Sequence, residues 1–257
     1  MSLQFSNLNL DIQGKTLLSD VSGTFPKGEV TALVGPNGSG KSTLLSIVSG
    51  LRAPTSGDVT LEGAPLSSLS KPHLARSLAL LPQRNPLPAT LTVKELVAFG
   101  RHPHKRWYQR SDDKDRALIE WAMQETEVTC YRDTPLTSLS GGELQRCWLA
   151  MVLAQDTPIL MLDEPTSWLD IAHQINLLTI VRRLNTDYGK TVVWVLHDLN
   201  QAKLYSDNAM LISEGSMVAQ GKVSEVLAPS VISDIYHTPI KQVNVDGQLI
   251  LWPEAQR

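Results

Sequence analysis

The run Val30-Thr-Ala-Leu-Val34 and the segment Gly35-Pro-Asn-Gly-Ser-Gly-Lys-Ser42 that follows it decide the fold class of this chain. The first run is short, apolar and β-branched, and residues 42–49 place leucine and valine at helical spacing. The order is therefore strand, loop and helix. The loop fits the pattern G-x-x-x-x-G-K-[ST], in which glycines let successive backbone N–H groups point inward around a phosphate. We expect an α/β protein that binds a nucleotide at this loop.

The chemistry of phosphate and Mg²⁺ binding explains the residue types in this loop. Lys41 is expected to reach the β- and γ-phosphates as a point charge, and the Ser42 hydroxyl to bind Mg²⁺. The start of the following helix adds the positive end of its dipole. A glycine-rich turn with a chance lysine is the alternative, which the strand before and the helix after the loop disfavour. The candidate nucleotide-binding residues here are Gly35, Pro36, Asn37, Gly38, Ser39, Gly40, Lys41, Ser42 and Thr43.

Two carboxylates follow a second apolar run. Residues 159–162 are continuously apolar, which is typical of a strand buried on both faces of a parallel sheet. Asp163 and Glu164 come at its carboxyl end, where open α/β sheets bind ligands. We expect Asp163 to bind Mg²⁺, and Glu164 to orient an attacking water or accept its proton. Taken alone, a charged loop is the simpler interpretation of 163–166, and the phosphate loop is what favours the catalytic one.

Three further positions are candidates with weaker local signals. His197 ends the apolar run 191–196, where an imidazole can donate a hydrogen bond to a γ-phosphate oxygen, although a lone histidine is more often structural. Gln83 follows the run 78–81 and could reach Mg²⁺ or the water; alone it is uninformative. Ser140-Gly141-Gly142 opens a predicted helix and forms a second anion-binding N-terminus, with an ordinary serine cap as the local alternative.

The composition narrows the class of protein. The 257 residues suggest one large domain or two small ones, and 42% apolar with 19% charged residues is typical of a globular protein. Lys and Arg number 23 against 26 Asp and Glu, which disfavours a protein that holds nucleic acid through its phosphates. We find no run of ~18 apolar residues and no secretion signal. Cys130 and Cys147 lack metal-ligand spacing, so we expect reduced thiols in a soluble cytoplasmic chain.

The middle of the chain differs from its two ends. Helical patterns at 93–100, 112–127 and 142–153 interrupt the alternation of strands and helices. Before them we expect a hairpin-like turn at 62–63, and after them a helix at 171–184, a strand at 191–196, a helix at 199–205 and a hairpin around 214–215. We predict a single domain, with a core of about 1–84 and 155–257 and a helical subdomain of about 85–154.

Taken together, these motifs resemble the ATP-binding subunit of an ABC transporter, over residues 3–227. The matching motifs are the Walker A loop (35–42), the Q-loop (Gln83), the signature segment (140–145), Walker B with its carboxylate (159–164), the D-loop (167–170, with Asp170) and the switch His197. The resemblance implies a P-loop NTPase (RecA-like) core with an antiparallel β-subdomain and an inserted helical subdomain. It also implies a head-to-tail homodimer, in which ATP and Mg²⁺ lie between the Lys41 loop of one subunit and the Ser140–Gly142 segment of the other.

The resemblance further implies integral-membrane permease subunits, an indirect link to a substrate-binding protein, and a peripheral place on the cytoplasmic face of the bacterial inner membrane. Gly100-Arg-His-Pro-His104, followed by Trp107, resembles an insertion in importers of ferric siderophores, haem and vitamin B12; its alternative is a solvated loop. We expect an ATPase that powers import of a ferric siderophore or related iron chelate. The alternatives are an importer of haem or vitamin B12, or a soluble ABC ATPase acting on nucleic acid or the ribosome.

Two residues depart from the family pattern. Ile12 occupies the place where the family stacks adenine on an aromatic side chain, so only an apolar contact with the base is expected. Trp168 stands in the D-loop, where a small residue is common. A non-catalytic regulator is disfavoured, because Lys41, Asp163, Glu164 and His197 are all intact.

Overall fold

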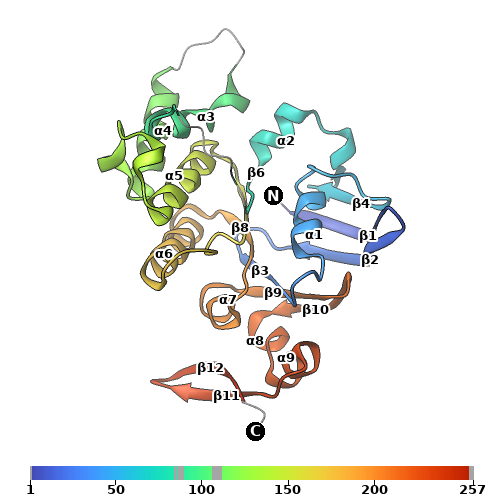
Figure 1. The fold of residues 1–257 in the computed structure, drawn as a ribbon. Coiled ribbons are helices and arrows are strands. Elements are labelled where there is room, and N and C mark those ends of the chain that lie inside the picture. Colours follow the sequence, from blue (N-terminus) through green and yellow to red (C-terminus); the bar gives the residue numbers. More distant parts are fainter. Residues whose placement is uncertain (1, 84, 86–89, 106–111, 255–257) are drawn as a thin grey trace. The chain divides into compact units, whose positions relative to one another are not determined.

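The computed structural model describes residues 2–83, 85, 90–105 and 112–254 (Figure 1). The chain separates into two compact units, one of Met1–Ser67 with Val193–Arg257 and the other of Ser68–Val192. The predicted helical subdomain at 85–154 falls within the second unit, which also contains neighbouring strands and a long helix. The boundaries predicted for that subdomain stay a prediction.

The first unit contains an antiparallel sheet with the strand order β2-β1-β4-β5. Its strands are β1 (Leu3–Ile12), β2 (Lys15–Phe25), β4 (Ser56–Leu61) and β5 (Ala64–Pro65). A two-residue turn joins β1 to β2, and Gln13 and Gly14 both have positive φ, 50° and 77°, which matches the twist of a tight hairpin. Leu3, Phe5 and Leu8 are buried, so one side of this sheet faces the core of the unit.

A second sheet in the same unit carries the phosphate loop. The strands of this sheet that belong to the unit have the order β10-β9-β3-β8, from β3 (Val30–Val34), β8 (Thr191–Val195, whose first two residues belong to the second unit), β9 (Asn208–Ser213) and β10 (Ser216–Lys222). Strands β3 and β9 pair in parallel, and β9 and β10 form the predicted hairpin. All five residues of β3 are buried, and α1 (Lys41–Val48) follows the loop after it. The strand, loop and helix predicted from 30–49 are confirmed.

The remaining elements of this unit lie toward the C-terminus, and those from α9 (Pro229–Tyr236) onward follow residue 227, where the family resemblance ends. The remaining elements are α7 (Leu199–Tyr205), α8 (Val223–Val226), α9 and the antiparallel hairpin of β11 (Ile240–Val245) and β12 (Gln248–Pro253). The Asn200 side chain on α7 donates to the Leu251 carbonyl at 3.2 Å and accepts from the Leu251 N–H at 2.8 Å. One amide group therefore fastens β12 to α7.

The second unit is mainly helical. Its elements are α2 (Lys71–Ser77), β6 (Leu78–Leu81), α3 (Val93–Phe99), α4 (Asp113–Glu125), α5 (Gly141–Ala154), β7 (Ile159–Asp163) and α6 (Ile171–Tyr188). Strands β6 and β7 pair in parallel, with Leu81 opposite Leu162. Short 3₁₀ turns lie at His102–His104, Thr129–Tyr131 and Leu136–Ser138. In the described part of the chain no helix is long and apolar enough to cross a membrane.

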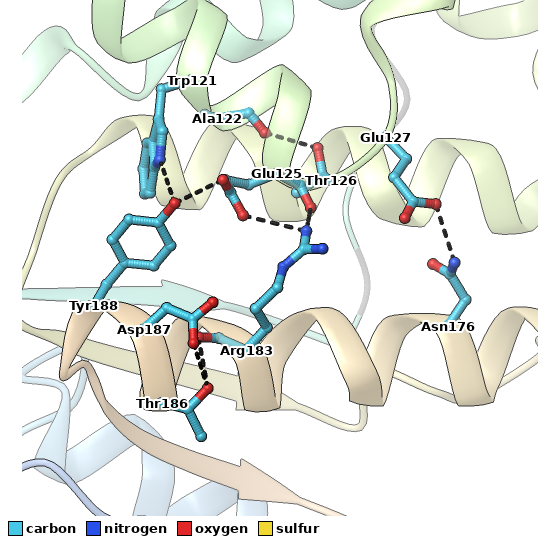
Figure 2. Close-up of polar contacts among 10 residues, drawn as sticks. All are labelled: Trp121, Ala122, Glu125, Thr126, Glu127, Asn176, Arg183, Thr186, Asp187 and Tyr188. Atoms are coloured by element: carbon cyan, nitrogen blue, oxygen red, sulfur yellow. Dashed lines mark hydrogen bonds and ion pairs between the residues drawn. The ribbon is translucent and has the colours of Figure 1, made fainter.

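Polar contacts join α4 to α6 within this unit (Figure 2). The Tyr188 hydroxyl donates to Glu125 Oε1 at 2.7 Å and accepts from Trp121 Nε1 at 3.2 Å, while the two rings meet edge to face. Arg183 pairs with the Glu125 carboxylate at 3.2 Å and donates to the Glu125 carbonyl at 2.9 Å. Residues of α6 thus hold both the side-chain carboxylate and the backbone carbonyl of Glu125.

The basic stretch after α3 is a packed corner in its described residues, which disfavours the alternative of a solvated loop. Arg101 is only 2% exposed, and its guanidinium donates to Asp115 Oδ1 at 2.8 Å and to the Ala154 carbonyl at 2.7 Å. A His104 ring nitrogen lies 2.8 Å from the Gln155 carbonyl. Trp107, predicted as part of the same insertion, lies outside the described residues.

Candidate nucleotide site

The phosphate loop joins β3 to α1 through glycines in conformations that L side chains rarely adopt. Gly35, Gly38 and Gly40 have φ of 143°, 76° and 106°. At Gly35 the need for glycine is steric as well, since an added Cβ would lie 1.9 Å from the Ile212 carbonyl oxygen. The curled backbone that a phosphate cradle requires is therefore built into the end of β3.

Two side chains of the loop, Lys41 and Ser39, are placed where they can bind an anion. Lys41 is buried, and its Nζ donates to the Gly35 and Pro36 carbonyls at 2.9 and 2.8 Å, so the ammonium is held at the beginning of the loop. Ser39 is 3% exposed, and among the described residues its hydroxyl has no hydrogen-bond partner. A buried unpaired hydroxyl costs about 1–3 kcal/mol. A phosphate oxygen in the loop would supply the missing partner.

The first unit also contains Ile12 and His197. Ile12 lies at the end of β1 opposite Lys15, beside the tight turn, with 37% of its surface exposed. An exposed aliphatic side chain fits the expected apolar contact, and its role toward a base stays a prediction. His197 follows β8 and is exposed, and the next residue, Asp198, caps α7 by accepting from the N–H groups of Asn200 and Gln201.

In the second unit the structure brings Gln83 and Glu164 together. Each follows one of two adjacent parallel strands, β6 and β7, whose carboxyl ends meet at the same edge. The Gln83 amide donates to Glu164 Oε2, and the Ser167 hydroxyl donates to the same oxygen at 3.0 Å. Glu164 has φ of 49°, a left-handed conformation that is uncommon for glutamate. Asp163 is the last residue of β7. The predicted water-activating residue is therefore held by two neutral donors beside the predicted Mg²⁺ ligand.

Ser140 forms a reciprocal cap at the start of α5. Its N–H and hydroxyl donate to Glu143 Oε2, both at 2.8 Å, and its Oγ accepts from the Glu143 N–H at 3.4 Å. The Tyr131 hydroxyl donates to the other oxygen, Oε1, at 2.6 Å. Hydrogen bonds from Tyr131 and then from Ser140 lower the pKa of Glu143 to about 2. Tyr131 was not among the predicted site residues, and nothing in its local sequence marks it.

The D-loop region adjoins this cap. Asp170 caps α6 by accepting from the His173 N–H at 2.9 Å, and its Oδ1 lies 2.7 Å from His173 Nδ1. These contacts lower the pKa of Asp170, the backbone N–H of His173 contributing most. A Cβ added to Gly142 would lie 2.3 Å from His173 Cδ2, so the starts of α5 and α6 pack closely. Trp168 is 92% exposed. A direct role of Asp170 in binding nucleotide stays a prediction.

The fold, the phosphate loop and the acidic residues after β7 together indicate the class of protein. A parallel strand pair with a Gly-rich phosphate loop before a helix, and acidic residues after a second buried strand, are the features of a P-loop NTPase. The ABC transporter family profile matches residues 18–167, more than half of the sequence, and the chain belongs to that family. The predicted α/β class, with an antiparallel sheet and a helical part, is confirmed.

Relatives with assigned names match nearly the whole chain. It is 37% identical over 256 residues to the iron(3+)-hydroxamate import ATP-binding protein FhuC of Bacillus subtilis (strain 168), covering 100% of this chain and 93% of the relative. It is 43% identical over 234 residues to the ferric enterobactin transport ATP-binding protein FepC of Escherichia coli (strain K12), covering 91% and 86%.

Two solved structures share the fold. A metal-chelate type ABC transporter in an inward-facing conformation matches with a TM-score of 0.86 at 25% identity, over 99% of this chain and 98% of that one. A dimeric, post-hydrolysis ABC cassette, MJ0796, bound to ADP and Pi matches with a TM-score of 0.75 at 27% identity, over 86% and 98%. An ATP-binding subunit of an ABC transporter is thus the class to which this chain belongs.

Proposed function

We propose that this chain is the ATP-hydrolysing subunit of an importer for a ferric siderophore or a related iron chelate. The observation that carries the ATPase part is the phosphate loop, where Lys41 is held in place and the buried Ser39 hydroxyl has no protein partner among the described residues. The relatives named for ferric hydroxamate and ferric enterobactin transport support the class of transported compound, because they match from 91% to 100% of the chain.

Binding of ATP rests on the loop and its neighbours. The loop N–H groups, Ser39 and Lys41 take the β- and γ-phosphates, and Ile12 offers an apolar contact to the base. Ser42, Gln83 and Asp163 would hold Mg²⁺, and their hydroxyl, amide and carboxylate oxygens are the hard donors that this ion prefers. When bound, Mg²⁺ neutralises charge on the phosphates.

Hydrolysis needs an oriented water and a stabilised γ-phosphate. Glu164 orients the water or accepts its proton, because hydrogen bonds from Gln83 and Ser167 hold its carboxylate at the end of β7. His197 donates a hydrogen bond to a γ-phosphate oxygen. Ser140, Gly141 and Gly142 bind the ATP held by a partner subunit, which explains a second anion-binding helix start in one chain.

The same proposal predicts the protein partners with which this chain assembles. The working form is a homodimer of this subunit, which the dimeric ABC cassette among the structural neighbours supports. It acts with integral-membrane permease subunits that dock near Gln83 and the helices after it, and indirectly with a substrate-binding protein. It sits peripherally on the cytoplasmic face of the bacterial inner membrane.

The chemistry is tested by Glu164→Gln. The amide keeps the size of the side chain but removes the carboxylate, so steady-state ATP hydrolysis should fall about 100-fold or more, the range expected for loss of a general base. ATP binding, measured by titration with a fluorescent ATP analogue, should stay near the wild-type value. The matched control is Glu225→Gln, an exposed glutamate on α8. Turnover within a few-fold of wild type would show that Glu164 is not the base.

The transported compound is tested separately by uptake. Cells with and without the gene are supplied with radiolabelled iron as a ferric hydroxamate or a ferric catecholate, and with labelled haem and cobalamin as comparators. We expect loss of uptake for at least one ferric chelate in the deletion strain, restored by the wild-type gene and not by the Glu164→Gln gene. Loss of haem or cobalamin uptake alone would contradict the iron-chelate assignment and leave the ATPase assignment intact.

A further inference from the structure

Glu143, in the first turn of α5, connects Ser140 with Tyr131. One carboxylate oxygen, Oε2, accepts from both the N–H and the hydroxyl of Ser140 at 2.8 Å. The other, Oε1, accepts from the Tyr131 hydroxyl at 2.6 Å, a short charge-assisted hydrogen bond. With both oxygens engaged, the carboxylate cannot rotate without breaking at least one of these bonds. The direction of the Ser140 hydroxyl therefore depends on where Glu143 is held.

Tyr131 is held by elements other than α5. It ends the 3₁₀ turn Thr129–Tyr131, and its N–H donates to the Val128 carbonyl at 3.0 Å. The next residue, Arg132, forms an ion pair with Glu120 of α4, and its carbonyl accepts from the Lys94 N–H of α3 at 2.9 Å. The Tyr131 hydroxyl is therefore presented to Glu143 from a framework fixed by α3 and α4.

The electrostatics of this cluster matter for an incoming phosphate. Glu143 stays ionised, because hydrogen bonds from Tyr131 first and then from Ser140 lower its pKa to about 2. An anionic phosphate at Ser140 would meet this negative charge, and like charges at close range repel. The Tyr131 hydroxyl draws part of that charge toward Oε1, on the opposite side of the carboxylate from Ser140.

We propose that Tyr131 is a positioning residue for Ser140: by holding Glu143 through Oε1, it keeps the carboxylate in place when the Ser140 hydroxyl turns from Oε2 to the γ-phosphate of ATP bound to a partner subunit. This inference rests on the proposed composite site. Tyr131 touches no reacting atom itself, and it acts only through Glu143. It should therefore affect the rate of hydrolysis by the assembled subunits and leave nucleotide binding to the Lys41 loop unchanged.

The test compares Tyr131→Phe with Tyr188→Phe in the full-length chain. Both changes remove a hydroxyl that donates to a glutamate, at 2.6 and 2.7 Å, and Tyr188 lies in the α4–α6 contact, where its partners are Glu125 and Trp121 (Figure 2). We expect kcat for ATP hydrolysis to fall about 3- to 10-fold in Tyr131→Phe only, in line with the loss of one hydrogen bond. The dissociation constant for a fluorescent ATP analogue should match wild type in both variants. Unchanged kcat in Tyr131→Phe, or an equal fall in both variants, overturns the proposal.

A double-mutant cycle that combines Tyr131→Phe with Ser140→Ala distinguishes the positioning of Ser140 from a general structural effect. If Tyr131 acts through Ser140, Tyr131→Phe should lower kcat no further in the Ser140→Ala background. A full 3- to 10-fold further loss there would show that Tyr131 acts elsewhere and would overturn the proposal. If Ser140→Ala alone hydrolyses ATP at the wild-type rate, the composite site of the proposed function fails, and the inference about Tyr131 fails with it.

Discussion

The buried ion pair of Arg101 and Asp115 allows a quantitative prediction of stability. Both side chains are nearly inaccessible, and Asp115 also lies 3.4 Å from Lys105 Nζ. Burial raises the pKa of Asp115, but its hydrogen bond with Arg101 and the charge of Lys105 outweigh this, so the net pKa is lowered. Among the described residues, Asp115→Ala leaves the buried Arg101 with the Ala154 carbonyl as its hydrogen-bond acceptor. Removing one partner of such a pair costs about 3–5 kcal/mol.

The assay is thermal and urea unfolding followed by circular dichroism. A loss of 3–5 kcal/mol corresponds to a fall in Tm of about 6–20 °C for a chain of this size. The matched control is Asp113→Ala on the same helix, whose carboxylate pairs with Arg116 but is 97% exposed, so it should cost less than about 1 kcal/mol. The double change Arg101→Met with Asp115→Leu should recover most of the loss, since the buried guanidinium and the buried carboxylate are removed together. If Asp115→Ala unfolds like Asp113→Ala, or if the double variant is less stable than Asp115→Ala, the ion pair does not stabilise this corner as argued.

Three further predictions concern the site. Ser140→Arg places a cation where the γ-phosphate of the partner's ATP should bind; it should abolish hydrolysis while binding at the Lys41 loop stays within the same order of magnitude, and loss of binding by the isolated subunit would count against a composite site. Ile12→Tyr should tighten ATP binding about five-fold over wild type, since stacking on a base is worth ~1–3 kcal/mol, and ATP and GTP titrations giving unchanged affinity would place Ile12 away from the base. The pKa of Glu143 is lowered from 4.5 to about 2, so its contribution to stability is present above pH 4.5 and is lost as the pH falls toward 2. Acid unfolding of Tyr131→Phe should therefore depend less steeply on pH in that range, and identical acid profiles would contradict the assigned cause of the pKa.

The sequence predicts best where the signal is local. The phosphate loop and α1 follow from glycines and a lysine at fixed spacing, and the structure confirms the strand, loop and helix over that segment. Gln83 and Glu164 were each predicted as site residues, but their contact spans 81 residues and depends on the pairing of β6 with β7, which no local pattern reveals.

The contacts that the sequence did not reveal are non-local in the same way. Arg101 lies in the run Arg-His-Pro-His-Lys-Arg, whose composition is typical of a solvated loop. Its burial depends on Asp115 and Ala154, which lie 14 and 53 residues further along the chain. Tyr131 contacts Glu143 only because two turns of the chain fold back before α5. Tertiary partners of this kind leave no trace in periodicity or motif spacing.

The fastening of β12 by Asn200 has a practical consequence. A two-stranded hairpin is marginally stable on its own in water, so β11 and β12 depend on contacts such as this amide pair. The Leu251 N–H is therefore protected from exchange with solvent deuterium only while the Asn200 side chain on α7 stays in place. Because α7 begins two residues after His197, that single amide proton reports on order beside this histidine from a site that ATP itself is not expected to touch.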